Sequence, residues 1–86
     1  MKITEIEYQG DKATLTLDGE QKLDIYPDLR IPIDKKKTYR VLSIGLNEGT
    51  GKLKIILGIY RKEKQMNCMS VGVSEFLEIL NEHKLI

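Results

Sequence analysis

The sequence predicts a mainly β domain, a small antiparallel barrel or sandwich of five to seven strands that ends in one helix. Three observations support this fold class. The stretch from Tyr39 to Tyr60 holds two apolar runs around a loop with Gly49 and Gly51, which is typical of a hairpin. The segments before it alternate apolar and polar residues with a period of two. Residues 74–83 space their apolar residues three and four apart, which is the helical period.

Length and composition set the class of protein. The chain has 86 residues, of which 41% are hydrophobic and 31% charged, and this indicates one globular domain with a single core. No apolar run approaches the roughly 18 residues of a membrane span, and the first residues lack the apolar core of a signal peptide. We therefore expect no membrane association and a cytoplasmic location. One cysteine, Cys68, agrees with a reducing compartment, and its neighbours Met66 and Met69 predict a place in or near the core.

The N-terminal third predicts a meander of three strands at residues 2–8, 12–17 and 22–26. In the first strand Ile6 and Tyr8 share one face and Ile3 points to the other, because side chains alternate along a strand. Asp18-Gly19 is a strong signal for a two-residue hairpin turn. The meander is amphipathic, so one of its faces must be covered.

Pro27 ends the third strand, because proline has no amide hydrogen to give to a ladder. The connector that follows is predicted to be extended before Pro32. Two interpretations of Ile31 and Ile33 stay open. They either leave an open sheet edge for another chain or fill the core as a further strand.

The central hairpin is apolar on both faces. From Leu53 to Tyr60, every second residue is a leucine or isoleucine, and the residues between them include Ile56 and Gly58. This pattern predicts a position in the middle of a sandwich or barrel. Residues 61–65 form either a hairpin loop or the solvated end of a long strand, and residues 66–73 form a last strand that breaks at Gly72.

The helix at 74–83 has recognisable ends. Ser74 is predicted to be its N-cap, and Glu75 lies in the first turn, where the helix dipole favours a negative charge. Phe76, Leu77 and Leu80 form the apolar face that covers the sheet.

Catalytic and metal-binding motifs do not emerge from the sequence. Gly49-Thr50-Gly51-Lys52 matches the end of a phosphate-binding loop, but the motif needs glycine at position 46, Ser or Thr at 53, and a helix after it. Leucine stands at both positions and a strand follows. His83, the one histidine, has no nucleophile at a recognisable spacing, and one Cys and one His do not make a zinc site. We expect no enzymatic activity, no metal and no cofactor.

Charge is unevenly distributed along the chain, although its net value is only +1. Residues 1–29 hold three Lys against seven Asp or Glu, a balance of −4, whereas residues 30–64 hold ten Lys or Arg against three acids, a balance of +7. A basic segment of this kind is typical of a face for nucleic acid or for an acidic partner. The candidate binding surface consists of the basic and aromatic residues on or beside the central hairpin: Lys35, Lys36, Lys37, Tyr39, Arg40, Lys52, Lys54, Tyr60, Arg61, Lys62 and Lys64.

Two binding hypotheses follow from these residues. Small β-barrels that bind single-stranded nucleic acid combine a basic groove with aromatic side chains for stacking, and Tyr39 and Tyr60 are placed to share a face with Lys54. The competing hypothesis is protein–protein contact through apolar residues and an open sheet edge, which also offers a route to a homodimer.

Residues 31–77 look like small bacterial SH3-like barrel domains. The resemblance rests on the extended Ile31-Pro32-Ile33, the charged turn after it, the strand Lys37–Ile44, a second long strand, and the ending Val73-Ser74-Glu75-Phe76. It implies a barrel-like topology and a binding module, and it carries over no residue roles. We therefore expect a non-enzymatic module that acts by protein–protein contact, as an inhibitor or adaptor. Binding of single-stranded nucleic acid by the basic segment is the alternative.

Overall fold

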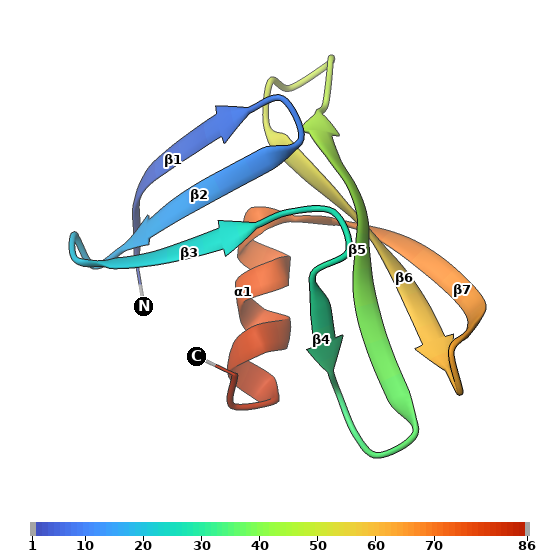
Figure 1. Ribbon diagram of the computed structural model, residues 1–86. Helices are drawn as coiled ribbons and strands as arrows, with labels where there is room; N and C mark the ends of the chain where they lie inside the picture. The colour runs from blue at the N-terminus through green and yellow to red at the C-terminus, as the bar shows by residue number, and fades with distance from the viewer. Residues whose placement is uncertain (1, 86) are drawn as a thin grey trace.

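The computed structural model describes residues 2–85 and contains seven strands and one helix, arranged in two antiparallel sheets (Figure 1). One sheet has the order β1-β2-β3 and the other β4-β5-β6-β7, so each strand pairs with its neighbours in the chain. The mainly β class with a C-terminal helix is confirmed. Among the described residues the strands form two separate sheets and no closed barrel. The elements are β1 (Ile3–Gln9), β2 (Lys12–Leu17), β3 (Gln21–Ile25), β4 (Arg30–Pro32), β5 (Lys37–Leu46), β6 (Leu53–Arg61), β7 (Lys64–Gly72) and α1 (Val73–Glu82).

Tight turns join the strands of the first sheet. Gly10, with φ of 69°, takes the first central position between β1 and β2, where the left-handed conformation favours glycine. Asp18 and Gly19 have φ of 53° and 75°, and the Glu20 amide donates to the Leu17 carbonyl at 3.1 Å, so a turn lies at the predicted position. The connection is one residue longer than the predicted two-residue hairpin, because Leu17 lies opposite Gln21. These turns confirm the three-stranded meander.

The chain crosses from the first sheet to the second at Asp28 and Leu29. The Asp28 amide donates to the Val41 carbonyl at 2.8 Å, and the Val41 amide donates to the Leu29 carbonyl at 2.9 Å. These two bonds lay the connector along β5 and start β4. Ile31 is 2% exposed and joins the core, while Pro32 stands on an edge strand, where a missing amide hydrogen costs no ladder bond.

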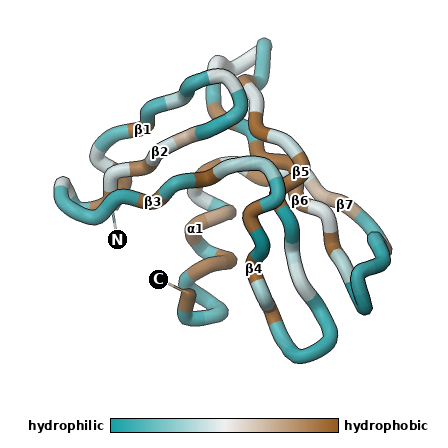
Figure 2. The backbone as a smooth tube through the Cα atoms, in the orientation of Figure 1, coloured by the Kyte–Doolittle hydropathy of each residue, from teal (hydrophilic) through white to brown (hydrophobic). Residues whose placement is uncertain are grey.

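The core lies between the two sheets and is closed by α1, which packs against β6 and β7. Figure 2 shows apolar residues along the strands that face this space and hydrophilic residues at the turns. Phe76 and Leu80 bring the helix into the core, and Phe76 is fully buried. The buried apolar residues of the core are Ala13, Leu15, Leu17, Ile25, Ile31, Val41, Ile44, Leu53, Ile55, Leu57, Val71, Phe76 and Leu80.

Register shifts change which side chains face this core. In β1 the ladder slips between Ile3 and Glu5, so Ile3 lies opposite Leu17 and Ile6 opposite Leu15, on the same face. The prediction that Ile3 points away from Ile6 and Tyr8 is therefore wrong, because Thr4 is an extra residue in the strand. A similar shift in β5 lets Val41 and Ile44, three residues apart, both point inward.

The outer face of the four-stranded sheet is open to solvent, contrary to the prediction that the hairpin is covered on both sides. Lys54, Cys68 and Ser70 are exposed on this face, so the expected core position of Cys68 is also wrong. The apolar residues there shield one another instead. A Cβ atom at Gly58 would meet the Tyr60 ring at 2.7 Å and a methyl carbon of Leu42 at 3.1 Å, so both side chains lie across the bare glycine.

The helix begins one residue before the predicted start. Gly72 is the N-cap, and its amide donates to the Glu75 carboxylate at 3.5 Å, so Ser74 lies inside the first turn and does not cap. The predicted break of the last strand at Gly72 is confirmed as the strand-to-helix junction. Within residues 2–85, no helix has the length and apolar character that a membrane crossing requires.

Candidate functional site

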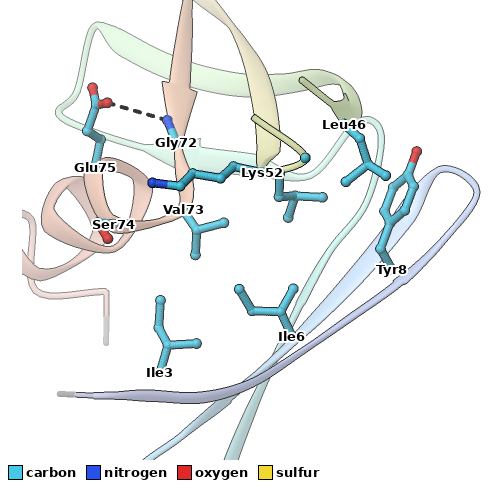
Figure 3. A pocket seen from close by; sticks show the side chains of 11 residues that line it. Ile3, Ile6, Tyr8, Leu46, Lys52, Gly72, Val73, Ser74 and Glu75 are labelled. Carbon is cyan, nitrogen blue, oxygen red and sulfur yellow. Dashed lines mark hydrogen bonds between the residues drawn. The ribbon is translucent and has the colours of Figure 1, made fainter. Parts of the chain in front are cut away.

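A cleft of about 800 Å³ opens between β1 and the junction of β7 with α1 (Figure 3). Its wall is apolar and comes from three regions of the chain: Ile3, Ile6 and Tyr8 from β1, Leu46 and Leu53 from the ends of β5 and β6, and Val73 from α1. Two large apolar side chains in this cleft are strongly exposed, Ile6 at 48% and Leu46 at 53%. The rim is polar and includes Lys52, whose side chain extends toward Gly72 and Val73, together with Ser74 and Glu75.

The topology explains why the cleft is open. The chain links the two sheets at the β3–β4 crossover, whereas β1 and β7 are the outer strands of their sheets and are not paired with each other. One hydrogen bond ties β1 to the other sheet, from the Tyr8 hydroxyl to the Ile44 carbonyl at 3.3 Å. The bulge at Thr4 turns Ile3 toward the cleft beside Ile6. The cleft is therefore a consequence of the fold and of one irregular register.

A second feature is a basic end of the four-stranded sheet, formed by the β4–β5 and β6–β7 turns. Strand pairing brings these turns together, because Lys37 lies opposite Arg61 and Arg61 lies opposite Lys64. Lys62 and Glu63 form the β6–β7 turn, while Arg61 ends β6 and Lys64 and Gln65 begin β7. The hairpin loop expected within residues 61–65 is therefore only two residues long, and the other three residues are paired ends of strands. The predicted residues that gather at this end are Lys35, Lys36, Lys37, Arg61, Lys62 and Lys64.

The other predicted site residues lie elsewhere. Arg40, Lys54 and Tyr60 occupy the outer face of the sheet, where the Arg40 guanidinium lies 4.5 Å from the centre of the Tyr60 ring. Tyr39 points to the opposite, inner face, so the expectation that it shares a face with Tyr60 is wrong. Lys52 belongs to the rim of the apolar cleft. It precedes the first residue of β6, whereas the basic end lies at the last residue of that strand.

Asp34 organises the charged β4–β5 turn. Its carboxylate accepts hydrogen bonds from the amides of Lys36 at 2.7 Å and Lys37 at 2.8 Å. The hydrogen bond from the Lys36 amide is the main reason that the pKa of Asp34 is lowered. Partial desolvation of the carboxylate raises this pKa, but the Lys37 amide and the charges of Lys37 and Arg61 lower it further.

Replacing Asp34 with alanine should lower the melting temperature by a few degrees near neutral pH, because the turn loses both hydrogen bonds. A carboxylate whose pKa is lowered in the folded state stabilises the fold fully at pH values above its unfolded-state pKa, which is about 3.9 for Asp. This stabilisation is lost as the pH falls toward and through the folded-state pKa. The difference in melting temperature between the variant and the parent should therefore shrink below about pH 4. Thermal unfolding followed by circular dichroism across this range is the measurement, and a pH-independent difference would contradict the assignment.

The residues of the apolar cleft were missed at the level of sequence. The available signal was the spacing of Ile3 and Ile6, since apolar residues three apart in a strand are typical of a bulge. Arg30, which lies directly opposite Arg40, was counted as a charge but not as a site residue.

Among residues 2–85, no three His, Cys, Asp or Glu side chains are grouped as a metal site would need. Comparisons with protein-family models, curated proteins and solved structures found no match.

Proposed function

We propose that this chain is a small non-enzymatic binding module that acts by protein–protein contact, with the partner seated in the apolar cleft beside β1. The exposure of Ile6 and Leu46 within one concave apolar surface supports this most directly. Apolar clefts with a polar rim are typical of interaction sites, because burying such side chains against a partner removes them from water.

The partner segment is an extended strand. β1 is an edge strand of seven residues, so one side of its backbone has no partner strand among the described residues. A strand added to this edge would satisfy these groups and place every second side chain over the cleft, beside Ile3 and Ile6.

Charge selects a basic partner strand. Glu5 and Glu7 are exposed on the face of β1 that points away from the cleft. Opposite charges in adjacent strands stabilise a pair and like charges destabilise it, so a strand with Lys or Arg on this face and apolar residues on the other is favoured. Antiparallel pairing of β1 with a second copy centred on Ile6 would place Glu5 opposite Glu7. A homodimer would instead use β7, which has nine residues and is the longest of the other edge strands. Of the remaining edges, β3 has five residues, and β4 has three and contains Pro32.

Replacing Ile6 with aspartate should weaken binding of a short peptide of alternating valine and lysine at least about tenfold, because a charge would enter the apolar cleft. The measurement is fluorescence anisotropy with the labelled peptide, together with amide chemical shifts along β1. Met66→Asp is the matched control, since Met66 is a large apolar side chain with 60% exposure outside the cleft.

Two results would count against the proposal. One is the absence of saturable binding by the valine–lysine peptide while the protein is folded. The other is an equal loss of affinity in the Ile6 and Met66 variants, which would remove the cleft from the interaction. A peptide of alternating valine and glutamate should bind more weakly, and light scattering measures self-association independently of either peptide.

A further inference from the structure

A group of cationic side chains on the outer face of the four-stranded sheet forms a site separate from the apolar cleft. A small cleft of about 90 Å³ lies there between β4, β5 and the β6–β7 turn. Its lining includes three cations, Arg30, Arg40 and Lys62, together with the Thr38 hydroxyl, the Tyr60 ring and one acid, Glu63. A cleft of this size with several donors suits a single compact oxyanion.

The pairing of two arginines is the first observation that points to an anionic ligand. Arg30 and Arg40 are direct cross-strand partners on β4 and β5, where like charges repel. The available acids compensate weakly. Glu63 lies 4.0 Å from Arg30 and is 84% exposed, while Asp28 lies 3.6 Å from the Arg40 Nε and is 80% exposed. Both carboxylates are largely exposed, and solvent screens their charges, so the two arginines keep much of their charge for a ligand.

Arg40 is held in place before any ligand arrives. Its side chain is 24% exposed, its guanidinium stacks over the Tyr60 ring, and the ring in turn lies over Gly58. The Tyr60 hydroxyl donates to the Gln65 side chain at 3.1 Å, which fixes the ring from the β7 side. The Arg40 Nε is buried and has no hydrogen-bond partner among the described residues. An ordered guanidinium loses little conformational freedom when it binds an anion.

The β6–β7 turn is the second observation. Lys62 and Glu63 both adopt positive φ, 53° and 62°, which is a left-handed conformation that β-hairpin turns normally give to Asn and Gly. The β2–β3 turn of the same chain uses Asp18-Gly19 for this geometry. The chain therefore tolerates backbone strain at the position that brings a lysine to the small cleft, and strained residues of this kind gather at functional sites.

We propose that Arg30, Arg40 and Lys62 bind a phosphate group of a single-stranded nucleic acid. The cations continue from this cleft onto the same end of the sheet through Lys35, Lys36, Lys37, Arg61 and Lys64, so a chain of phosphates rather than one isolated anion is favoured. The Arg40 guanidinium lies over the Tyr60 ring, and the two groups together offer an unpaired base a surface on which to stack.

Lys62→Asn is the most informative variant. It removes one cation and gives the left-handed turn position a residue that it favours, so the melting temperature should rise while affinity for a labelled oligothymidylate falls about tenfold at low salt. Lys84→Asn is the matched control. Lys84 is exposed, also has positive φ, 56°, and lies after α1 outside the small cleft, so this variant should bind within about twofold of the parent.

A second variant and a salt titration complete the test. Arg30→Gln should weaken binding by a similar factor, and removing one cation that binds a phosphate should reduce the slope of log affinity against log salt by about 0.7. The proposal is overturned if oligothymidylate does not bind at low salt, or if Lys84→Asn weakens binding as much as Lys62→Asn. Tighter binding of a duplex, of a phosphoserine peptide or of inorganic phosphate would overturn the assignment to a single strand. Since none of these variants touches the apolar cleft, binding of the valine–lysine peptide should persist in all of them.

Discussion

Replacing Phe76 with alanine will lower the free energy of unfolding by about 3–5 kcal/mol, the range observed when a buried aromatic ring is removed from a core. Phe76 is the largest fully buried side chain among residues 2–85 and comes from the helix that closes the space between the sheets. A domain of this size has a total stability on the order of 5–15 kcal/mol, so the variant will lose a large fraction of its stability. Urea denaturation followed by far-ultraviolet circular dichroism measures the change.

A graded substitution separates the loss of packing from a loss of the helix. Phe76→Leu retains an apolar side chain and should cost roughly half as much, because a smaller cavity is left. Leu77→Ala on the same helix, at a half-buried position, should cost less than Phe76→Ala. Equal effects at the two positions would show that the helix face is wrongly assigned.

Leu57→Ala should lower the free energy of unfolding by about 2–5 kcal/mol, whereas Ile56→Ala, one residue away on the same strand, should cost about 1 kcal/mol or less. Leu57 is fully buried between the sheets, and Ile56 is half-buried on the outer face. The comparison holds the strand, its neighbours and the type of truncation nearly constant. Denaturant midpoints at equal m-values are the measurement.

A similar loss at both positions would mean that the outer face of β6 is covered by something in solution, such as a second copy of the chain. The concentration dependence of the midpoint distinguishes these cases, because an oligomer becomes more stable as protein concentration rises. A monomer with one buried face predicts a midpoint that does not depend on concentration.

Local signals predicted the strands, turns and helix well. The alternation in residues 12–17, the Asp18-Gly19 turn and the helical spacing after Gly72 each depend on neighbours in the chain, and all three are confirmed. The choice between one barrel and two sheets depends instead on which strand edges meet. No local pattern in the sequence predicts that β3 and β4, although consecutive in the chain, belong to different sheets and do not pair.

The errors have specific physical causes. A bulge residue reverses the alternation, and Thr4 hides this because threonine suits either face of a strand. The outer face of the central hairpin was predicted to be covered because Ile56, Gly58 and Tyr60 alternate there with only one charged residue, Lys54. Gly58 lets neighbouring side chains lie flat across it, so the face is partly shielded without a second layer. The capping role given to Ser74 belongs to the backbone of Gly72 with Glu75.

Part of the binding surface was accessible from composition and part was not. The charge balance along the chain identified the basic segment. Its residues form one basic end of the sheet because strand pairing places the β4–β5 and β6–β7 turns side by side. The sequence could not show that the predicted residues lie at two ends and on two faces of the sheet, because this depends on the strand register. The register places Tyr39 and Tyr60 on opposite faces, and Lys52 and Lys62 lie beyond opposite ends of β6. The apolar cleft required the arrangement of the two sheets.

The pairing of each strand with its neighbour in the chain has a consequence for how the protein folds. The longest connection within a sheet is the loop of residues 47–52, so every ladder closes across a short segment at a small entropic cost. Chains whose contacts are mostly local in sequence fold faster than chains of the same size with distant pairings. Each meander can therefore form early by itself, and the slow event is the meeting of the two around Phe76. The rate of refolding should thus be governed by the helix that arrives last in the sequence, although most of the protein is sheet.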